Sequence, residues 1–452
     1  MPSNVAPVGL ARQLAARARE GRPVRIGLVG AGEMGTDIVT RASLMEGIEV
    51  AAVADVDGAR AHRSVRIARG ETGHSEDATS ATGLDAVIES GRTAVADSAD
   101  AIIESGLVDV VIDATGIPAV GAEIGLAAME RGKHLVMMNV EADVTIGAFL
   151  RAEAERLGVV YTLGAGDEPS SCMELIEFAS AMGHRVVCAG KGKNNPLNPD
   201  AVPDGYREEA ERRGLNPRML VEFVDGSKTM VEMCAIANAT GLVPDVPGMH
   251  GPAAGPRELA ATLIPRRDGG VLSDAGRVDY SVGKGLAPGV FVVIEAEHPR
   301  VAMRMADLKM GEGPYFTLIR PYHLTSLEVP LTCARAVLDG KADMVPLERP
   351  VAEVCALAKR DIAAGETLDQ IGETAYRAWA MTAEDARARR ALPCGLLAGG
   401  RATAAIPKGE LITADRVTIP SDSRIAALRA RQDAMLGYAS PGYGENGERA
   451  VA

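Results

Sequence analysis

Aromatic residues are scarce, at 3% of the 452 residues, so the cores have to be built mainly from aliphatic side chains. No CxxC pair occurs among the six scattered cysteines, which indicates buried or incidental thiols in a reducing compartment. Basic residues do not cluster with aromatic ones and the net charge is −13, which argues against a nucleic-acid partner. No apolar run is long enough to span a bilayer, and the first residues lack the apolar core of a secretory signal. We therefore expect a soluble, cytoplasmic protein of two or three domains.

Glycine, in contrast, is abundant, and three glycines lie close together near the N-terminus. The stretch VRIGLVGAGEMG, residues 24–35, is a strand-like apolar run followed by Gly30, Gly32 and Gly35, with Glu33 and Met34 opening a helix over 34–45. A second apolar strand over 48–54 then ends in Asp55. This order of strand, glycines, helix, strand and acid is typical of a dinucleotide-binding unit, in which the backbone approaches the pyrophosphate at the helix N-terminus. The alternative is a tight turn without a ligand.

The acid at position 55 predicts which cofactor is bound. A carboxylate here accepts hydrogen bonds from a ribose 2′-hydroxyl and repels a 2′-phosphate, so Asp55 favours NAD over NADP. Arg60 and Arg63 follow and serve either a phosphate or surface solvation.

Strands and helices continue to alternate as far as residue 163, which predicts an α/β fold with a doubly wound parallel sheet. Strands over 108–112, 133–138 and 159–163 enclose helices over 119–131 and 146–157. We expect Thr115, Gly116 and Asn139, at strand ends, to face the nicotinamide half of the cofactor. Residues 71–92 are interpreted as a polar insertion.

Polar side chains gather between residues 164 and 330. Asp167 and Glu168 lie in a glycine-rich turn before a helix. Lys191, Lys193 and Asn194 follow a strand over 186–189, where they suit a phosphate or a developing oxyanion, or equally a solvated turn. The remaining candidates are Ser227, Lys228, Thr229 and Glu232 at a helix start, His250 in a Pro/Gly loop, and Arg320, Tyr322 and His323 before a helix whose Thr325 and Glu328 have capping-box spacing. Neither HExxH nor GxSxG occurs, so zinc or serine hydrolysis is unsupported.

A near-repeat closes the chain. DIAAGETLD at 361–369 is echoed by AIPKGELIT at 405–413, and both copies read as strand, Gly-Glu turn, strand. The pattern predicts a small β-rich domain over 350–420 that resembles a SAF domain.

Taken with the stretches GAGEMGTDIVT, DATGIP, VMMNVEADVTIG, AGKGKNNPLN and GPYFTLIRPYHLTSLEVPLT, this repeat makes the chain similar to the 1-deoxy-D-xylulose 5-phosphate reductoisomerase-like oxidoreductases. The resemblance, over residues 22–437, implies a homodimer with a dinucleotide-binding domain at 22–165, a catalytic and dimerisation domain at 166–345 and the SAF-like domain. It also implies NADPH-dependent conversion of 1-deoxy-D-xylulose 5-phosphate into 2-C-methyl-D-erythritol 4-phosphate.

One departure qualifies this resemblance, because Asp55 stands where an NADPH enzyme carries small or basic residues. Homoserine dehydrogenase itself is disfavoured, because its Asn-Lys pair is here Asn139-Val140 and the catalytic lysine of that family is missing. The chain is thus a reductoisomerase acting on a phosphorylated sugar or, alternatively, an NAD-dependent dehydrogenase of a related polyol or sugar acid. A third alternative is a nucleotide-sensing protein whose SAF domain binds a carbohydrate.

For either reaction we assign roles to the polar residues. Lys191 and Lys193 stabilise an oxyanion or phosphate, with Asn194 beside them. Lys228, with Ser227 and Thr229, binds the substrate phosphate, and His323 transfers a proton. Asp167 and Glu168 act as acid and base, or hold Mg²⁺ or Mn²⁺ together with Glu232.

Overall fold

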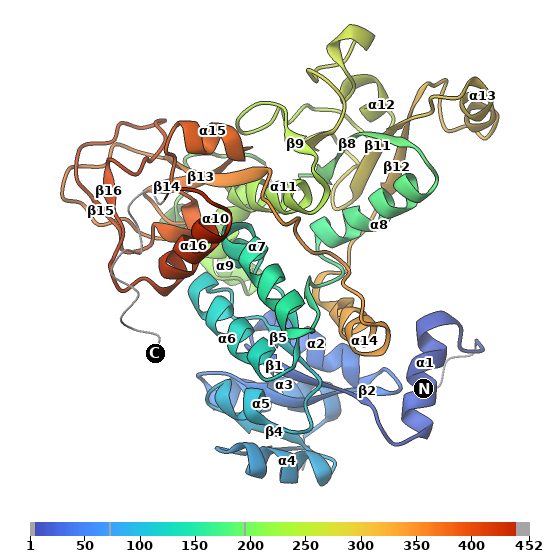
Figure 1. Cartoon of the computed structure of the whole chain (residues 1–452), viewed down its shortest axis with the longest axis vertical. Helices are drawn as coiled ribbons and strands as arrows, with labels where there is room; N and C mark the ends of the chain where they lie inside the picture. The colour runs from blue at the N-terminus through green and yellow to red at the C-terminus, as the bar shows by residue number, and fades with distance from the viewer. Residues whose placement is uncertain (1–4, 72–73, 194–195, 440–452) are drawn as a thin grey trace. The chain divides into compact units, whose positions relative to one another are not determined.

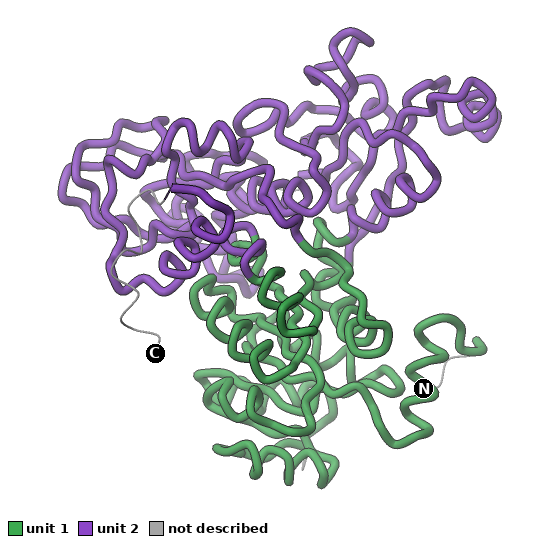
Figure 2. The backbone as a smooth tube through the Cα atoms, viewed as in Figure 1, with its two compact units in different colours: residues 1–143, 150–170, 324–345 green, residues 144–149, 171–323, 346–452 purple. Residues whose placement is uncertain are grey.

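The computed structural model describes residues 5–71, 74–193 and 196–439. It divides into two compact units (Figure 2). Unit 1 comprises residues 1–143, 150–170 and 324–345, and unit 2 comprises residues 144–149, 171–323 and 346–452. The division into domains at 22–165, 166–345 and 350–420 stays a prediction.

Unit 1 is built on a seven-stranded parallel sheet, so the expected α/β fold is confirmed (Figure 1). The strand order is β3-β4-β2-β1-β5-β6-β7. The strands are β1 (Val24–Val29), β2 (Ile48–Ala54), β3 (Ser75–Asp77), β4 (Thr93–Ala96), β5 (Val110–Asp113), β6 (His134–Met137) and β7 (Tyr161–Leu163). β1 pairs with β2 on one side and with β5 on the other, so the sheet extends outward from β1 in both directions. Open α/β sheets bind ligands at the point where the strand order reverses in this way.

Two hydrophobic cores cover the two faces of this sheet. One packs α2 (Glu33–Ser43) and α14 (Val329–Asp339) onto it, and the other packs α4 (Ala81–Glu89), α5 (Asp100–Glu104) and α6 (Pro118–Glu130). The remaining helices of this part are α1 (Gly9–Arg19), α3 (Gly58–Arg69) and α7 (Val140–Leu157). The interpretation of 71–92 as an insertion was wrong. Its described residues contain β3 and α4, and with β4 they extend the sheet by two strands.

Unit 2 contains a mixed sheet of five strands in the order β12-β11-β8-β10-β9. They are β8 (Arg185–Gly192), β9 (Val243–Pro244), β10 (Arg277–Ser281), β11 (Val290–Glu295) and β12 (Tyr315–Arg320). The helices of this region are α8 (Glu168–Ala181), α9 (Arg207–Arg213), α10 (Pro217–Val224), α11 (Ser227–Thr240), α12 (Leu259–Thr262) and α13 (Pro299–Asp307). α11 is buried along almost its whole length and contacts β8 and β10.

The C-terminal segment contains β13 (Ala352–Ala358), β14 (Tyr376–Thr382), β15 (Arg401–Ala402), β16 (Val417–Thr418), α15 (Ala383–Ala388) and α16 (Arg424–Met435). The near-repeat of the sequence is also a repeat in space. Ile362 and Ile406 form a β-bridge with each other, and Gly365 and Gly409 have φ of 85° and 84°. Each turn uses glycine because a left-handed backbone is strained for other residues.

The six cysteines are free thiols and all are buried. Among the described residues, no helix combines the length and the apolar character needed to cross a membrane.

Candidate functional site

The glycine-rich turn joins β1 to α2, and its glycines are needed for different reasons. A Cβ on Gly30, whose φ is 103°, would lie 2.6 Å from the carbonyl oxygen of Ala114, and one on Gly35 would lie 2.1 Å from that of Gly30. Packing therefore excludes a side chain at both. Gly32, the exposed N-cap of α2, has nothing within 4 Å of a Cβ position. The protein's own packing does not require glycine there, but close approach of a pyrophosphate to the backbone does.

Glu33 is exposed and Met34 is half-buried in the first turn of α2. Asp55, at the end of β2, turns its carboxylate towards the glycine turn. Its Oδ2 accepts a hydrogen bond from Ala31 N at 2.8 Å, and its Oδ1 accepts from Asp57 N at 2.9 Å. The Arg60 guanidinium lies 3.4 Å from Oδ1. Asp55 therefore holds the glycine turn in place, and its side chain is only 5% exposed. Its expected contact with a ribose stays a prediction.

A second polar group follows β5. Asp113 is fully buried, and its Oδ1 accepts hydrogen bonds from the backbone and hydroxyl of Thr115. Burial raises the pKa of Asp113, and the hydrogen bonds from Thr115 and Asn139 oppose this rise. Asn139 caps α7 through Oδ1, and Gly121 packs so closely that a Cβ there would lie 2.0 Å from Asp113 Oδ2. Asp113 is not among the residues predicted from the sequence, although its position at a strand end could have indicated it.

These residues all belong to unit 1 and fit a dinucleotide. The open position at Gly32 and the N-terminus of α2 would hold the pyrophosphate. Asp55 would hold the ribose, and Thr115, Gly116 and Asn139 would lie at the strand ends expected for the nicotinamide half. Bound NAD would supply a hydride acceptor. The individual contacts stay predictions.

In unit 2, a cluster of buried charges surrounds the end of β8 and the start of α11. Lys191 of β8 forms an ion pair with Glu232 of α11, and the two side chains are 6% and 0% exposed. In the sheet Lys191 lies beside Tyr280 of β10. The alternative of a solvated turn does not fit Lys191. A lysine in such a turn would keep its ammonium group in water, whereas the side chain of Lys191 is buried.

Lys193 follows β8 directly and is also buried. Its Nζ donates a hydrogen bond to the carbonyl of Phe223 at 2.5 Å. Burial and the positive charge of Lys191 lower the pKa of Lys193 to about 8, against the opposing effect of Asp225 and Glu232. Near neutral pH this amine is thus poised to exchange a proton.

The start of α11 is fixed by contacts that the sequence did not indicate. Asp225 is buried in an ion pair with Lys359, at 2.9 Å, and accepts a hydrogen bond from Ser227 N. Ser227 Oγ accepts from Ala378 N of β14, so it joins α11 to β14 and is not the N-cap, which is Gly226. Lys228 is half-buried in the same turn, and Thr229 is buried. Lys359, which directly follows β13, was missed because it does not stand in a motif.

The other candidates are placed as follows. Asp167 and Glu168 are half-buried in unit 1, whereas Glu232 belongs to unit 2, so their shared divalent ion stays a prediction. His323 of unit 2 donates from Nδ1 to the carbonyl of Pro288 at 2.6 Å. Asn194 lies outside the described residues.

The capping box at Thr325 and Glu328 was wrong. The Glu328 carboxylate accepts from Leu324 N, and residues Thr325–Leu327 form a separate 3-10 turn before α14. His250 is held in its loop by Asp245, which accepts from its Nε2 at 2.8 Å and also pairs with Arg277.

Two family models match successive parts of the chain. Residues 30–163 match the family model "Homoserine dehydrogenase, NAD binding domain", and residues 166–329 match "Oxidoreductase DRL, catalytic domain". No curated protein sequence matches significantly. The chain is therefore an NAD(P)-dependent oxidoreductase, as expected, and the more specific resemblance to the reductoisomerase-like enzymes stays a prediction.

Similar solved structures include an NAD-binding oxidoreductase from Klebsiella pneumoniae, at 20% identity and a TM-score of 0.28 over 40% of this chain and 45% of that one. The chain thus spans less than half the length of that protein. A probable dehydrogenase from Thermotoga maritima has 15% identity and a TM-score of 0.39, over 70% and 90%. Scyllo-inositol dehydrogenase from Lactobacillus casei, solved with NAD(H) and scyllo-inositol, has 13% identity and a TM-score of 0.40, over 71% and 91%.

Proposed function

We propose that this oxidoreductase is an NAD-dependent dehydrogenase that oxidises a hydroxyl group of a small anionic polyol, sugar acid or sugar phosphate. Unit 1 would bind NAD through the glycine turn and Asp55. The buried lysines of unit 2 would bind the substrate. We also propose that the protein acts as a homodimer.

The observation that carries the proposal is the burial of two neighbouring lysines at the end of β8. Burial and the positive charge of Lys191 lower the pKa of Lys193 to about 8, and Lys191 itself pairs with Glu232. Burying two amines close together is costly, so this arrangement indicates a task rather than a contribution to folding. A substrate carboxylate or phosphate would accept charge-assisted hydrogen bonds from lysines of this cluster.

The lowered pKa of Lys193 suits the proton step of the same reaction. Oxidation of an alcohol releases a hydride from carbon and a proton from oxygen. Bound NAD would supply the acceptor for the hydride. The neutral amine of Lys193 would take the hydroxyl proton, while Lys191, held by Glu232, would stabilise the alkoxide-like oxygen.

The test is a steady-state assay of the full chain with NAD⁺ against polyols, sugar acids and their phosphates. We expect turnover with an anionic member of the panel and about 30- to 1,000-fold lower kcat/KM for Lys193→Ala, with nucleotide affinity retained. Lys341→Ala, at an exposed lysine of unit 1, is the control and should remain within about threefold of wild type. Equal turnover of neutral and anionic substrates would refute the role of the lysines.

A reductoisomerase is the second candidate, favoured by the match of residues 166–329 to the catalytic domain of an oxidoreductase family and by the carboxylates near the lysines. Rearrangement of a carbon skeleton needs acid–base groups and a stabilised enediolate, which these residue types can supply. Incubation with 1-deoxy-D-xylulose 5-phosphate and NADH or NADPH, followed by product identification, separates the two candidates. A branched product supports the reductoisomerase, and its absence with turnover of a polyol supports the dehydrogenase.

A further inference from the structure

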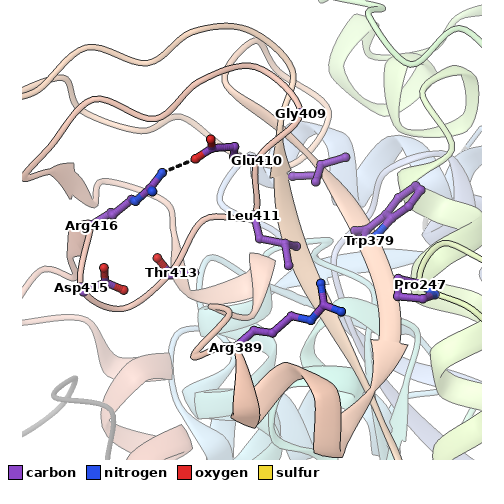
Figure 3. Close-up of a pocket in the computed structure, with 10 residues that line it drawn as sticks. Pro247, Trp379, Arg389, Gly409, Glu410, Leu411, Thr413, Asp415 and Arg416 are labelled. Carbon is purple, nitrogen blue, oxygen red and sulfur yellow. Dashed lines mark hydrogen bonds and ion pairs between the residues drawn. The ribbon is translucent and has the colours of Figure 1, made fainter.

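Arg377 of β14 is half-buried in unit 2 and lies on an aromatic ring. Its guanidinium stacks over the indole of Trp379, 4.5 Å from the ring centroid. Pro247 and Trp379 line the same cavity (Figure 3), and a Cβ on Gly248 would lie 2.1 Å from the indole. Packing on these sides fixes the ring and, through the stacking, favours one plane for the guanidinium.

The guanidinium of Arg377 has no anionic partner in the structure. Within residues 5–71, 74–193 and 196–439 it forms neither an ion pair nor a hydrogen bond. Burial lowers the pKa of Arg377, and the nearby Asp225 and Tyr280 oppose this change. The carboxylate of Asp225 is already paired with Lys359 at 2.9 Å. A partly desolvated cation without a partner is costly, so this one indicates a place for an anion.

A second donor without a partner lies on β10. Tyr280 is only 7% exposed, yet its hydroxyl group forms no hydrogen bond within the described part of the chain. The backbone of Gly251 packs against the hydroxyl end of the ring, since a Cβ there would lie 2.5 Å from the oxygen. Asp279 holds this loop by accepting from the N–H groups of His250 and Gly251, at 3.0 and 2.9 Å. Because a buried hydroxyl without a partner costs free energy, Tyr280 also indicates a ligand.

Arg377 and Tyr280 both lie close to the buried lysines of β8. Tyr280 is the direct neighbour of Lys191 in the parallel pairing of β10 with β8, so the two side chains lie on the same face of the sheet. Burial raises the pKa of Tyr280 and lowers that of Arg377, and each residue opposes the shift of the other. Asp225 likewise opposes the fall in pKa that burial causes in both Arg377 and Lys193.

We propose that Arg377 and Tyr280 bind the carboxylate of a hydroxycarboxylic acid and hold its alcohol group near Lys191 and Lys193. This substrate class rests on the proposed dehydrogenase function. The guanidinium offers two parallel N–H donors, which match the two oxygens of a carboxylate, and the phenol offers one more donor. The C-terminal β-rich segment thus supplies a substrate-binding residue to the five-stranded sheet domain.

The balance of charge favours a carboxylate over a phosphate. Lys191 is paired with Glu232, and Lys193 has to be neutral when it acts as the base. Of these three cations, Arg377 alone then keeps a charge without a partner. It matches the single charge of a carboxylate, whereas a phosphate carries about −1.5 to −2 charges and would bury a surplus.

Trp379 reports on this site, because it is the only tryptophan of the chain and Arg377 stacks on it. Glycerate, D-xylonate and D-gluconate are titrated into the full chain without nucleotide. We expect at least one of them to change Trp379 fluorescence saturably, at millimolar or lower concentration. The polyol of the same length (glycerol, xylitol or D-sorbitol) and its terminal phosphate should each bind about tenfold more weakly than that acid.

Variants are compared by isothermal titration calorimetry, because a change at Arg377 itself alters the emission of Trp379. Arg377→Met should weaken binding of the acid about tenfold or more, and Tyr280→Phe about threefold or more. Arg377→Lys keeps the charge without the planar fork and should lie between Arg377→Met and wild type. Arg431→Met is the matched control, because Arg431 is an exposed arginine of α16 that stacks on Phe149 at 4.7 Å. It should bind the acid as wild type does.

The proposal is overturned if none of the three acids binds saturably, if the phosphate binds more tightly than the acid, or if Arg377→Met and Tyr280→Phe both bind as wild type does. Binding is measured without NAD⁺, so these outcomes do not depend on turnover. An acid that binds through Arg377 and is not oxidised would instead refute the proposed dehydrogenase and leave the carboxylate site standing.

Discussion

Lys191 and Glu232 are 41 residues apart in the chain and form an ion pair that is almost fully removed from solvent. The pair joins β8 to α11 and places one lysine of the proposed substrate site against a fixed carboxylate. Removing one partner of such a pair leaves a buried, uncompensated charge, which is far more destabilising than replacing both.

Glu232→Gln should therefore lower the free energy of unfolding by roughly 3–5 kcal/mol. The double variant Lys191→Met/Glu232→Leu should recover most of that loss, because neither residue then carries a charge, but it should remain inactive. Urea denaturation and the dehydrogenase assay measure the two effects. Equal stability of Glu232→Gln and wild type would contradict the importance of the pair.

The pKa of Lys193 predicts how activity and stability depend on pH. Because the folded-state pKa is lowered from 10.5 to about 8, the unfolded chain binds more protons between these values, and stability should increase as pH rises through this window. The contribution is lost as pH falls through about 8. If neutral Lys193 is the base, kcat/KM should also rise with an inflection near the same pH. Lys193→Met should remove both dependences, and unchanged profiles would exclude this role.

Asp55 is expected to make NAD(H) the tighter-binding cofactor. Asp55→Ser should weaken NADH binding and shift the ratio of NADH to NADPH affinity at least about tenfold towards NADPH, because it removes the charge that repels a 2′-phosphate. Asp57→Asn, which keeps an oxygen able to cap α3, is the control. Dissociation constants from fluorescence titration decide the matter. The prediction would be contradicted if the wild-type protein bound NADPH tenfold more tightly than NADH.

Gly32 and Gly35 provide a matched pair within one motif. Gly35→Ala should destabilise unit 1, since its Cβ would lie 2.1 Å from the Gly30 carbonyl oxygen. Gly32→Ala enters open space and should leave the melting temperature nearly unchanged while it weakens NADH binding. Differential scanning fluorimetry with and without NADH distinguishes the two effects. Loss of stability in Gly32→Ala would show that this glycine serves the fold instead.

Lys228→Ala tests whether the start of α11 binds an anionic substrate. We expect about 30- to 1,000-fold lower kcat/KM on an anionic substrate, with unchanged NADH affinity. Lys284→Ala, at an exposed lysine of unit 2, should stay within about threefold of wild type. A similarly small effect of Lys228→Ala on kcat/KM would show that Lys228 does not bind the substrate.

The sequence by itself determined the nucleotide-binding fold, because the interactions that form it are local. The strand over 24–29, the glycines and the helix that follows lie within about twenty residues. Their hydrophobic periodicity and their spacing can therefore be recognised in the amino-acid sequence. The same reading failed at 71–92, since β3 has only three residues, all polar, and lacks the apolar alternation that reveals a strand.

Only the tertiary structure decided which polar groups meet. Lys359 pairs with Asp225 across 134 residues, and Ser227 bonds to β14 across 151 residues, so no local pattern could have indicated either contact. The lysines at 191 and 193 could be read from sequence as a solvated turn or as a site with equal justification. Their burial, which depends on how α11 and β10 pack against β8, is what distinguishes the two, because a charge costs little in water and much in the interior.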